Sequence, residues 1–171
     1  MIRKIFLSSA FAMLTLVSMN AQKIAIVDVT NILENLSDYE NAQKEIDKVA
    51  AEWRQEIAQQ FDEIKSMYNK YQAEQVLLSD DLKQKREDEI MEREKQVREL
   101  QRRRFGTEGD LFRRRQELVS PIQDKVFQAI EDFAGDRGYD IILDKTGSAG
   151  LLFASDEYDK TDEIKRSLGI R

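Results

Sequence analysis

The 171-residue sequence contains no cysteine and no histidine, and it has one proline and seven glycines. Without cysteine, disulfides and thiolate chemistry are excluded. Without histidine, the chain lacks the commonest general base and the commonest metal ligand, so we expect neither an enzyme nor a bound cofactor. The shortage of proline and glycine leaves few residues that interrupt helices. The composition therefore favours long helices and argues against catalysis.

Charge is the most abundant chemical feature of the chain. Charged residues make up 35% of the sequence, and the net charge is −6. A composition of this kind favours long, exposed helices over a thick globular core. The isoelectric point is near 4.9, whereas surfaces that bind nucleic acid are basic. We therefore do not expect nucleic acid as a partner.

Residues 1–21 have the three-part layout of a secretory signal peptide. Arg3 and Lys4 form a basic start, an apolar run covers 5–17, and mostly small, uncharged residues lead to Ala21. The apolar run is too short to span a bilayer stably. We therefore predict export and cleavage after Ala21. The removed segment contains two basic and no acidic residues, so the net charge changes from −6 to −8.

The stretch 38–119 is predicted to form a long helical hairpin. Residues 38–78 contain no glycine or proline, and apolar residues recur there every three or four positions, as they do along one side of a helix. These positions are Ala42, Ile46, Val49, Trp53, Ile57, Phe61, Ile64, Tyr68 and Tyr71. A turn near 78–81 and a return limb at 82–119 complete the hairpin. Its limbs of 41 and 38 residues predict an arm roughly 60 Å long, at about 1.5 Å per residue.

The return limb has a thinner apolar seam than the outbound limb. Its clearest positions are Ile90, Val97, Leu111 and Leu118, with Arg104 at the missing step. Gly106 and Gly109 each weaken a helix by about 1 kcal/mol relative to alanine, so we predict a hinge there. The sequence SPIQ at 120–123 predicts a break or kink at Pro121, where the arm would meet the last long helix.

Several hydroxyl residues are predicted to begin helices as N-caps, among them Ser79 before the return limb and Ser120 before the last long helix. Thr30 precedes a short apolar helix, Ser37 precedes the outbound limb, and Thr161 precedes a short closing helix. Side-chain oxygens at such positions accept hydrogen bonds from free backbone N–H groups. Ser37 and Glu40 also have the spacing of a capping box.

Residues 22–37 and 120–171, together 68 residues, are predicted to form one small mixed β/α body. Strands are expected at 24–27, 139–144 and 151–155, so the fold class is mainly α with a small β body. Such a body has a marginal core and leaves short strand edges unpaired, so we predict that it oligomerises. The residues expected between copies are Ile24, Ile26, Ile141, Leu143, Leu151 and Phe153.

The order of these segments resembles the Skp/OmpH family of periplasmic chaperones. The resemblance rests on KIAIVD after the signal, the charged hairpin, PIQDKVFQAI, and GYDIILD followed by a further strand and a D-x-T-D-E-I ending. It implies a periplasmic, jellyfish-like homotrimer, in which helical arms surround a cavity that holds unfolded outer-membrane proteins without ATP. Some family members have a basic surface linked to lipopolysaccharide. The isoelectric point near 4.9 argues against lipopolysaccharide or anionic lipid as a ligand here.

The segment QRRRFGTEGDLFRRRQ at 101–116 contains two arginine triplets, eleven positions apart. Residues 98–115 have a local charge of +4, and residues 38–78 have −4. The favoured interpretation is that the two limbs attract each other. The alternative is contact with acidic client segments or lipid head groups. The candidate client-contact residues are Met91, Arg102, Arg103, Phe105, Phe112, Arg113 and Arg114.

The aromatic residues of the hairpin allow the same two interpretations. Packing within the hairpin is favoured for Phe61, Tyr68 and Tyr71, because they lie on the regular stripe. For Phe105 and Phe112, seven residues apart, packing and client contact are weighted equally. A structural coiled-coil spacer of the cell envelope is the alternative function. It requires a dense, regular heptad seam, which Arg104 and the two glycines interrupt.

Overall fold

The computed structural model describes residues 22–147 and 150–170, and the predicted signal peptide and its cleavage site lie outside them. Two strands and five helices follow in the order β1 (Ile24–Val27), α2 (Val29–Glu34), α3 (Ser37–Glu74), α4 (Asp80–Phe105), α5 (Asp110–Arg137), β2 (Ile141–Asp144) and α6 (Thr161–Ser167). Two short 3₁₀ turns, η1 (Gln75–Leu77) and η2 (Asp156–Tyr158), complete the list. The predicted mainly helical fold with a small β body is confirmed for a single chain.

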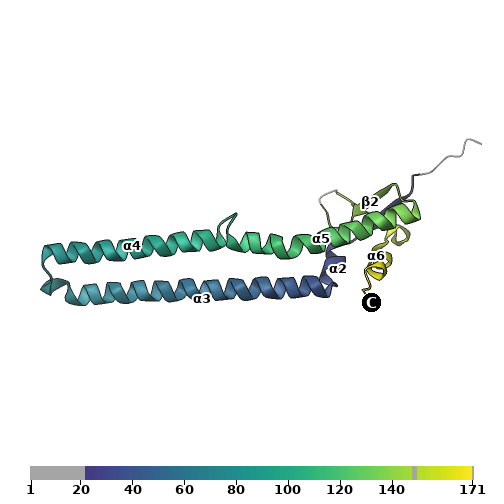
Figure 1. The fold of residues 1–171 in the computed structure, drawn as a ribbon. Helices are drawn as coiled ribbons and strands as arrows, with labels where there is room; N and C mark the ends of the chain where they lie inside the picture. The colour runs from purple at the N-terminus through teal and green to yellow at the C-terminus, as the bar shows by residue number, and fades with distance from the viewer. Residues whose placement is uncertain (1–21, 148–149, 171) are drawn as a thin grey trace, which may run out of the picture.

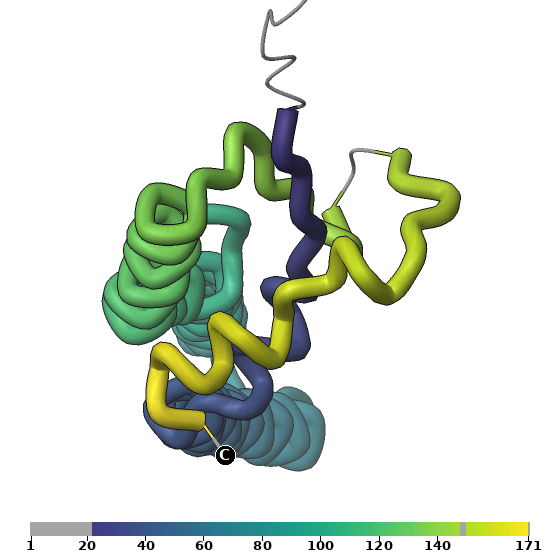
Figure 2. The backbone as a smooth tube through the Cα atoms, turned by 90° about the vertical axis from the view of Figure 1, so that its right-hand side faces the viewer, coloured from purple at the N-terminus to yellow at the C-terminus, as the bar shows by residue number. Residues whose placement is uncertain are grey.

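A long antiparallel arm extends from one side of a small body (Figure 1). Helix α3 forms one limb, and it packs against both α4 and α5, which together form the other limb. Its 38 residues give the arm a length of about 57 Å. The strands, α2, α6 and the C-terminal end of α5 form the body, at the end of the molecule opposite the tip of the arm (Figure 2). No described helix is both long enough and apolar enough to cross a membrane.

The seam between the limbs is narrower than the sequence pattern predicted. The buried residues in the outer part of α3 repeat every seven positions, at Ala50, Ile57, Ile64 and Tyr71. They face Ile90, Val97 and Leu100 of α4. Phe61 is 40% exposed and Tyr68 is 50% exposed, so the prediction that these two pack inside the hairpin was wrong. A helix with only one neighbour needs one narrow apolar stripe, and these aromatic rings fall beside it.

The body is built on a two-stranded parallel sheet. Strand β1 pairs with β2 in the register Ile24↔Ile141 through Val27↔Asp144. On its other edge, β1 makes an isolated bridge from Ile26 to Asp159. Residues of α2, α5 and α6 cover the sheet and enclose one apolar cluster. Its buried members are Val27, Ile32, Leu33, Leu36, Val126, Phe133 and Ile164.

The third predicted strand, at 151–155, does not form within the single chain. This segment pairs with neither β1 nor β2. Leu152 is 98% exposed and Phe153 is 85% exposed. The apolar composition of LLFAS suits a strand, but a strand also requires hydrogen bonds to a partner edge. Both edges of β1 are already in use, and the segment does not pair with the outer edge of β2.

The N-caps predicted at Thr30, Ser37 and Thr161 were wrong, whereas Ser79 does lie at the N-cap position of α4, without a side-chain hydrogen bond. Asp28 caps α2 in place of Thr30, and its carboxylate accepts the Asn31 N–H at 2.8 Å. Helix α3 has Leu36 at the N-cap position and no side-chain cap, so Ser37 is its first residue and no capping box forms. Thr161 is the first residue of α6, and its hydroxyl instead accepts the Asp28 N–H at 2.9 Å.

The interruption of the return limb lies at Gly106–Gly109, and the break predicted at Pro121 is absent. Helix α5 continues through Pro121 to Arg137. The tight loop at 106–109 protrudes from the limb (Figure 1). A Cβ atom on Gly106 would lie 2.4 Å from the Arg102 carbonyl oxygen, and one on Gly109 would lie 2.7 Å from that of Arg103. These close approaches require glycine, whereas packing against α3 keeps α5 intact around its proline. Motion about this loop, as a hinge, stays a prediction.

Asp159 connects three parts of the body. Its carboxylate accepts the Thr161 N–H at 2.9 Å and the Lys145 ammonium at 3.1 Å. Burial alone would raise the pKa of Asp159, but the hydrogen bonds from Thr161 and Lys145 outweigh it, so the pKa is lowered from its ordinary 3.8. The hydrogen bond to Asp159 raises the pKa of Lys145.

The glycines of the loop provide a first test. We expect Gly106→Ala to lower the free energy of unfolding by about 1–3 kcal/mol, the usual cost of forcing an atom into occupied space. The matched control is Gly135→Ala, because a Cβ there meets nothing within 4 Å and alanine favours helix. Urea titrations followed by circular dichroism measure both. Equal stability of Gly106→Ala and the unaltered protein would contradict the close approach.

A second test concerns pH. Because the folded pKa of Asp159 is lowered, its contribution to stability is present above about pH 4, near the unfolded pKa, and is lost as pH falls through the folded pKa. We therefore expect Asp159→Asn to be less stable than the unaltered protein at pH 7, with the difference shrinking below about pH 4. Urea titrations at pH 7, 5 and 3 measure it. A difference that is constant with pH would show that the Asp159 charge is not involved.

Candidate functional site on the helical arm

Arg104 joins the three helices that meet at the interruption of the arm. Its guanidinium lies 2.9 Å from Asp110 of α5 and 3.8 Å from Glu56 of α3. It also stacks over the Trp53 ring, 4.4 Å from the centroid. Phe105 packs edge-on against the same ring, with the centroids 6.3 Å apart. The sequence placed Arg104 at a gap in the apolar seam, and the structure fills that gap with a partly buried charged cluster.

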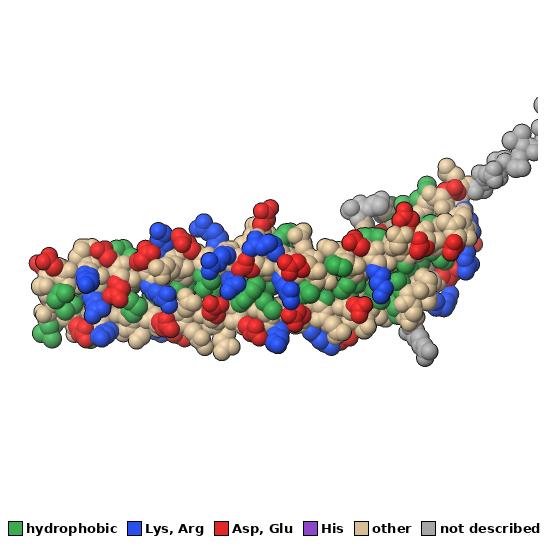
Figure 3. All heavy atoms as spheres, in the orientation of Figure 1, with side chains coloured by type: hydrophobic (Ala, Val, Ile, Leu, Met, Phe, Trp, Pro, Cys, Tyr) green, Lys and Arg blue, Asp and Glu red, His purple; other side chains and the backbone are tan. Residues whose placement is uncertain are grey.

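Ion pairs between the limbs recur along the arm. Besides Arg104, they join Arg93 to Glu63 at 3.1 Å, Arg114 to Glu45 at 3.2 Å, and Lys125 to Asp38 at 3.7 Å. Charged side chains of both signs follow the arm from end to end (Figure 3). Hydrogen bonds to Glu45 and Glu117 raise the pKa of Arg114. Attraction between the limbs, the favoured interpretation of the arginine triplets, therefore holds for Arg104 and Arg114.

Three of the four remaining arginines of the triplets lie around the loop. Arg102, Arg103 and Arg113 line a hollow of about 400 Å³ together with both glycines. Arg113 also pairs with Asp110 and donates to the Glu108 carbonyl oxygen at 2.8 Å. The two triplets do not form one stripe on a continuous helix, because the loop separates α4 from α5.

The loop also separates Phe105 and Phe112, the two aromatic candidates for client contact. Phe105 ends α4 and is partly buried against Trp53, whereas Phe112 belongs to α5 and is 44% exposed. The two rings therefore do not share one helical face as predicted. Met91 is 55% exposed on α4.

Sequence reasoning missed two exposed apolar surfaces on the arm. One is a hollow of about 400 Å³ between α3 and α4, lined by Arg54, Ile57, Ala58, Phe61, Gln101 and Phe105. The other is the tip, where Val76 and Leu77 are 84% and 85% exposed. The signal for the first was available: with a seam at 50, 57, 64 and 71, the row 54, 61 and 68 lies beside it.

The residues predicted to join copies of the body differ in their exposure. Ile24 and Ile141 are 37% and 40% exposed on neighbouring strands, and Phe153 is 85% exposed. Leu143 and Leu151 are half-buried. Ile26 is only 5% exposed, because the body of its own chain covers it, so its side chain is not open to another copy in this structure.

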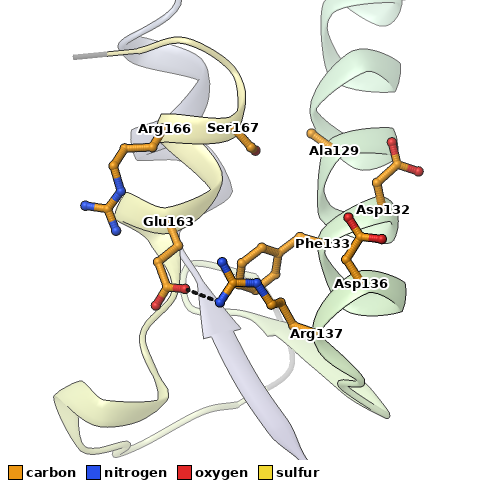
Figure 4. Close-up of a pocket in the computed structure, with 8 residues that line it drawn as sticks. All are labelled: Ala129, Asp132, Phe133, Asp136, Arg137, Glu163, Arg166 and Ser167. Carbon is orange, nitrogen blue, oxygen red and sulfur yellow. Dashed lines mark ion pairs between the residues drawn. The ribbon is translucent and has the colours of Figure 1, made fainter.

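A further hollow of about 480 Å³ lies between α5 and α6 in the body. Asp132, Asp136 and Glu163 surround it together with Arg137 and Arg166, and Arg137 lies 3.9 Å from Glu163 (Figure 4). Acidic and basic groups therefore largely compensate one another here. Among residues 22–147 and 150–170, no cluster of histidine, cysteine or carboxylate side chains is suited to a metal ion.

Comparison with known proteins agrees with this architecture. The family model described as Outer membrane protein (OmpH-like) matches residues 23–168. The chain belongs to the OmpH-like family. A relative named Chaperone protein Skp, from Pectobacterium atrosepticum, is 28% identical over 141 residues, which cover 80% of this chain and 81% of the relative. The family resemblance is thus confirmed, and OmpH-like proteins of this kind are chaperones without enzymatic activity.

A solved structure extends the comparison to the fold. The crystal structure of an OmpH-like protein from Caulobacter crescentus CB15 has a TM-score of 0.72 and covers 86% of this chain and 84% of its own. Its sequence identity is only 10%. The two chains therefore share a fold despite their low sequence identity.

The cluster around Arg104 gives a third test. We expect Arg104→Gln to lower the free energy of unfolding by about 1–3 kcal/mol, because Asp110 and Glu56 lose a charged partner in a partly buried place. The matched control is the adjacent Arg103→Gln, whose side chain is exposed, with an expected change within about 0.5 kcal/mol. Trp53 is the only tryptophan, so its fluorescence reports the loss of the stacked cation. Equal effects of the two substitutions would contradict a special role of Arg104.

Proposed function

We propose that this protein is an ATP-independent periplasmic holdase, which binds unfolded outer-membrane proteins between the arms of a homotrimer and prevents their aggregation. The observation that supports it most directly is the free arm of the OmpH-like fold. Its narrow seam leaves Phe61, Tyr68 and Met91 exposed along the limbs. Surfaces of this kind suit many weak contacts with an unfolded chain.

The client chemistry fits such an arm. An unfolded β-barrel protein exposes alternating apolar side chains and unpaired backbone groups, and it aggregates through them. Separate apolar contacts spaced along an arm bind such a chain without requiring one sequence or one conformation. Because each contact is weak, the client can leave without an energy source. The sequence KTGSAG at 145–150 lacks the GK[ST] of a phosphate-binding loop and follows β2, which accords with a function that needs no nucleotide.

Assembly into a homotrimer is supported by the body. A two-stranded sheet is marginally stable alone, and Ile24 and Ile141 are exposed on it. Leu152 and Phe153 extend from the body without a partner. We propose that these segments pair with the sheets of neighbouring copies, so that the arms project together and enclose a cavity. The acidic isoelectric point gives no support to lipopolysaccharide or anionic lipid as ligands.

A structural spacer in the cell envelope is the second candidate, and one observation favours it. The buried residues of α3 repeat every seven positions from Ala50 to Tyr71, which is the pattern of a coiled coil. The loop at 106–109 interrupts that pattern in the other limb, and a rigid rod has no use for such an interruption. A spacer is not expected to bind denatured proteins, so binding of a denatured protein distinguishes the holdase from the spacer.

Light scattering of the purified protein, alone and with an outer-membrane protein diluted from urea, tests the proposal. We expect a mass of three protomers, uptake of the client and suppression of its turbidity. The same barrel protein in its folded form is the control, and we expect no binding to it. A monomer or dimer that leaves the turbidity unchanged would refute the holdase and bring the spacer forward.

A further inference from the structure

The two sides of the arm seam differ in chemistry. Ile64 lies on the seam, and a helix turns 100° per residue, so Glu63 falls on one side of it and Phe61 on the other. Glu56 lies seven residues before Glu63 and therefore on the same side. Both glutamates form ion pairs to α4, with Arg104 and Arg93. This side of the seam is covered by charged pairs.

The opposite side leaves large apolar side chains exposed, with Arg54 and Arg98 among them. Phe61 and Tyr68 are seven residues apart and project from the same side of α3. Phe105 lies across the seam on α4 and shares the hollow with Phe61. Met91 precedes Phe105 by fourteen residues, close to four helical turns, so it belongs to the same side of α4. We name these four residues the apolar flank.

The hollow within the apolar flank has the features of a site for one side chain. Buried Ile57 forms its base, the Phe61 and Phe105 rings form two walls, and exposed Arg54 and Gln101 lie at its rim. A large apolar side chain placed in the hollow would contact the four apolar residues that line it, Ile57, Ala58, Phe61 and Phe105. Arg54 and Gln101 can then donate hydrogen bonds to carbonyl groups of the bound backbone, which otherwise lose their water without compensation.

The occupant is not another part of the described chain or a second arm. Phe61 and Tyr68 lie in the outer half of α3, whereas the ends of the described part of the chain lie at the body (Figure 1). Phe61, Tyr68 and Met91 are 40%, 50% and 55% exposed, which amounts to roughly 300 Å² at the 150–250 Å² of a large side chain. A stable interface between folded copies buries about 800 Å² on each partner. The patch suits a transient, extended partner.

From this we infer that the apolar flank is the client-contact surface of the arm, and that its hollow takes one aromatic or large aliphatic side chain of an extended polypeptide. This inference rests on the proposed holdase function and adds where on the arm the client lies. It moves the contact from the arginine triplets to the row containing Phe61 and Tyr68, and it places the charged side of the seam away from the client.

Paired substitutions test the assignment. Phe61→Gln with Tyr68→Gln removes the two exposed aromatic rings of the flank and keeps good helix-forming residues. We expect the concentration needed to suppress half of the client turbidity to rise about tenfold, the change that one lost contact of ordinary strength gives. The matched control is Val76→Gln with Leu77→Gln at the tip. These residues are more exposed than the flank, and we expect less than a twofold change.

Trp53 supplies a second readout. It is the only tryptophan and contacts Phe105 at the edge of the hollow. With a client variant that lacks tryptophan, we expect the Trp53 emission to shift on binding, and Phe61→Gln with Tyr68→Gln to reduce this shift. Circular dichroism and light scattering check that helicity and mass are unchanged in each variant.

The outcomes separate this inference from the proposed function. If the unaltered protein fails to suppress turbidity, the holdase itself is refuted. If it suppresses turbidity while the flank variant acts equally well and Trp53 does not respond, the client binds elsewhere and only the flank assignment fails. Equal losses of turbidity suppression in the flank and tip variants would also overturn the flank assignment, because nonspecific apolar binding would then explain both.

Discussion

A helix in a two-helix hairpin has one neighbour, and it can therefore bury only one narrow stripe of side chains. In the outer part of this arm, the buried stripe of α3 contains about one residue for every two helical turns, as Ile57, Ile64 and Tyr71 show. Everything beside the stripe must be charged and paired or apolar and exposed. Both solutions occur, on opposite sides: Glu63 pairs with Arg93, while Phe61 remains exposed. The candidate site is thus a consequence of the arm geometry.

The interruption of the return limb depends on the same constraint. Arg104 lies at a seam position where an apolar residue would normally pack. Its charge is accommodated because Trp53 provides a π face and Asp110 provides a carboxylate from the next helix. Asp110 begins α5 immediately after the loop, so the loop and the buried charge form one unit. Glycine at 106 and 109 lets the backbone approach the carbonyl groups closely enough to build it.

The sequence was informative about the arm because its signal is long. Forty residues without glycine or proline and with regular apolar spacing define a helix, whatever the exact identity of its stripe. The stripe itself was harder to assign, because Phe61 and Tyr68 are as apolar as Ile57 and Ile64 and lie only about 60° away from them. Choosing between two adjacent rows requires knowing how many neighbours the helix has, which periodicity does not reveal.

Local signals failed wherever tertiary contacts decided the outcome. Proline is common at the first position of a helix, but α5, packed against α3, continues through Pro121. Thr161 has the chemistry of an N-cap, yet its hydroxyl accepts a hydrogen bond from Asp28, 133 residues away in the sequence. Residues 151–155 have the composition of a strand but pair with neither β1 nor β2 within the chain. Each of these misses concerns a choice between partners that are distant in sequence.

The exposed apolar groups raise the question of why the arm does not aggregate. Their arrangement gives an answer, since Phe61, Tyr68 and Met91 are separated along two helices and charged residues surround them. Single exposed apolar residues are tolerated on soluble proteins, whereas large contiguous patches promote association. A net charge of −6 adds repulsion between copies. An extended chain can contact these separated groups one after another, but a second rigid arm cannot match them all at once. Spacing the groups in this way therefore favours unfolded partners over self-association, without any need for a deep pocket.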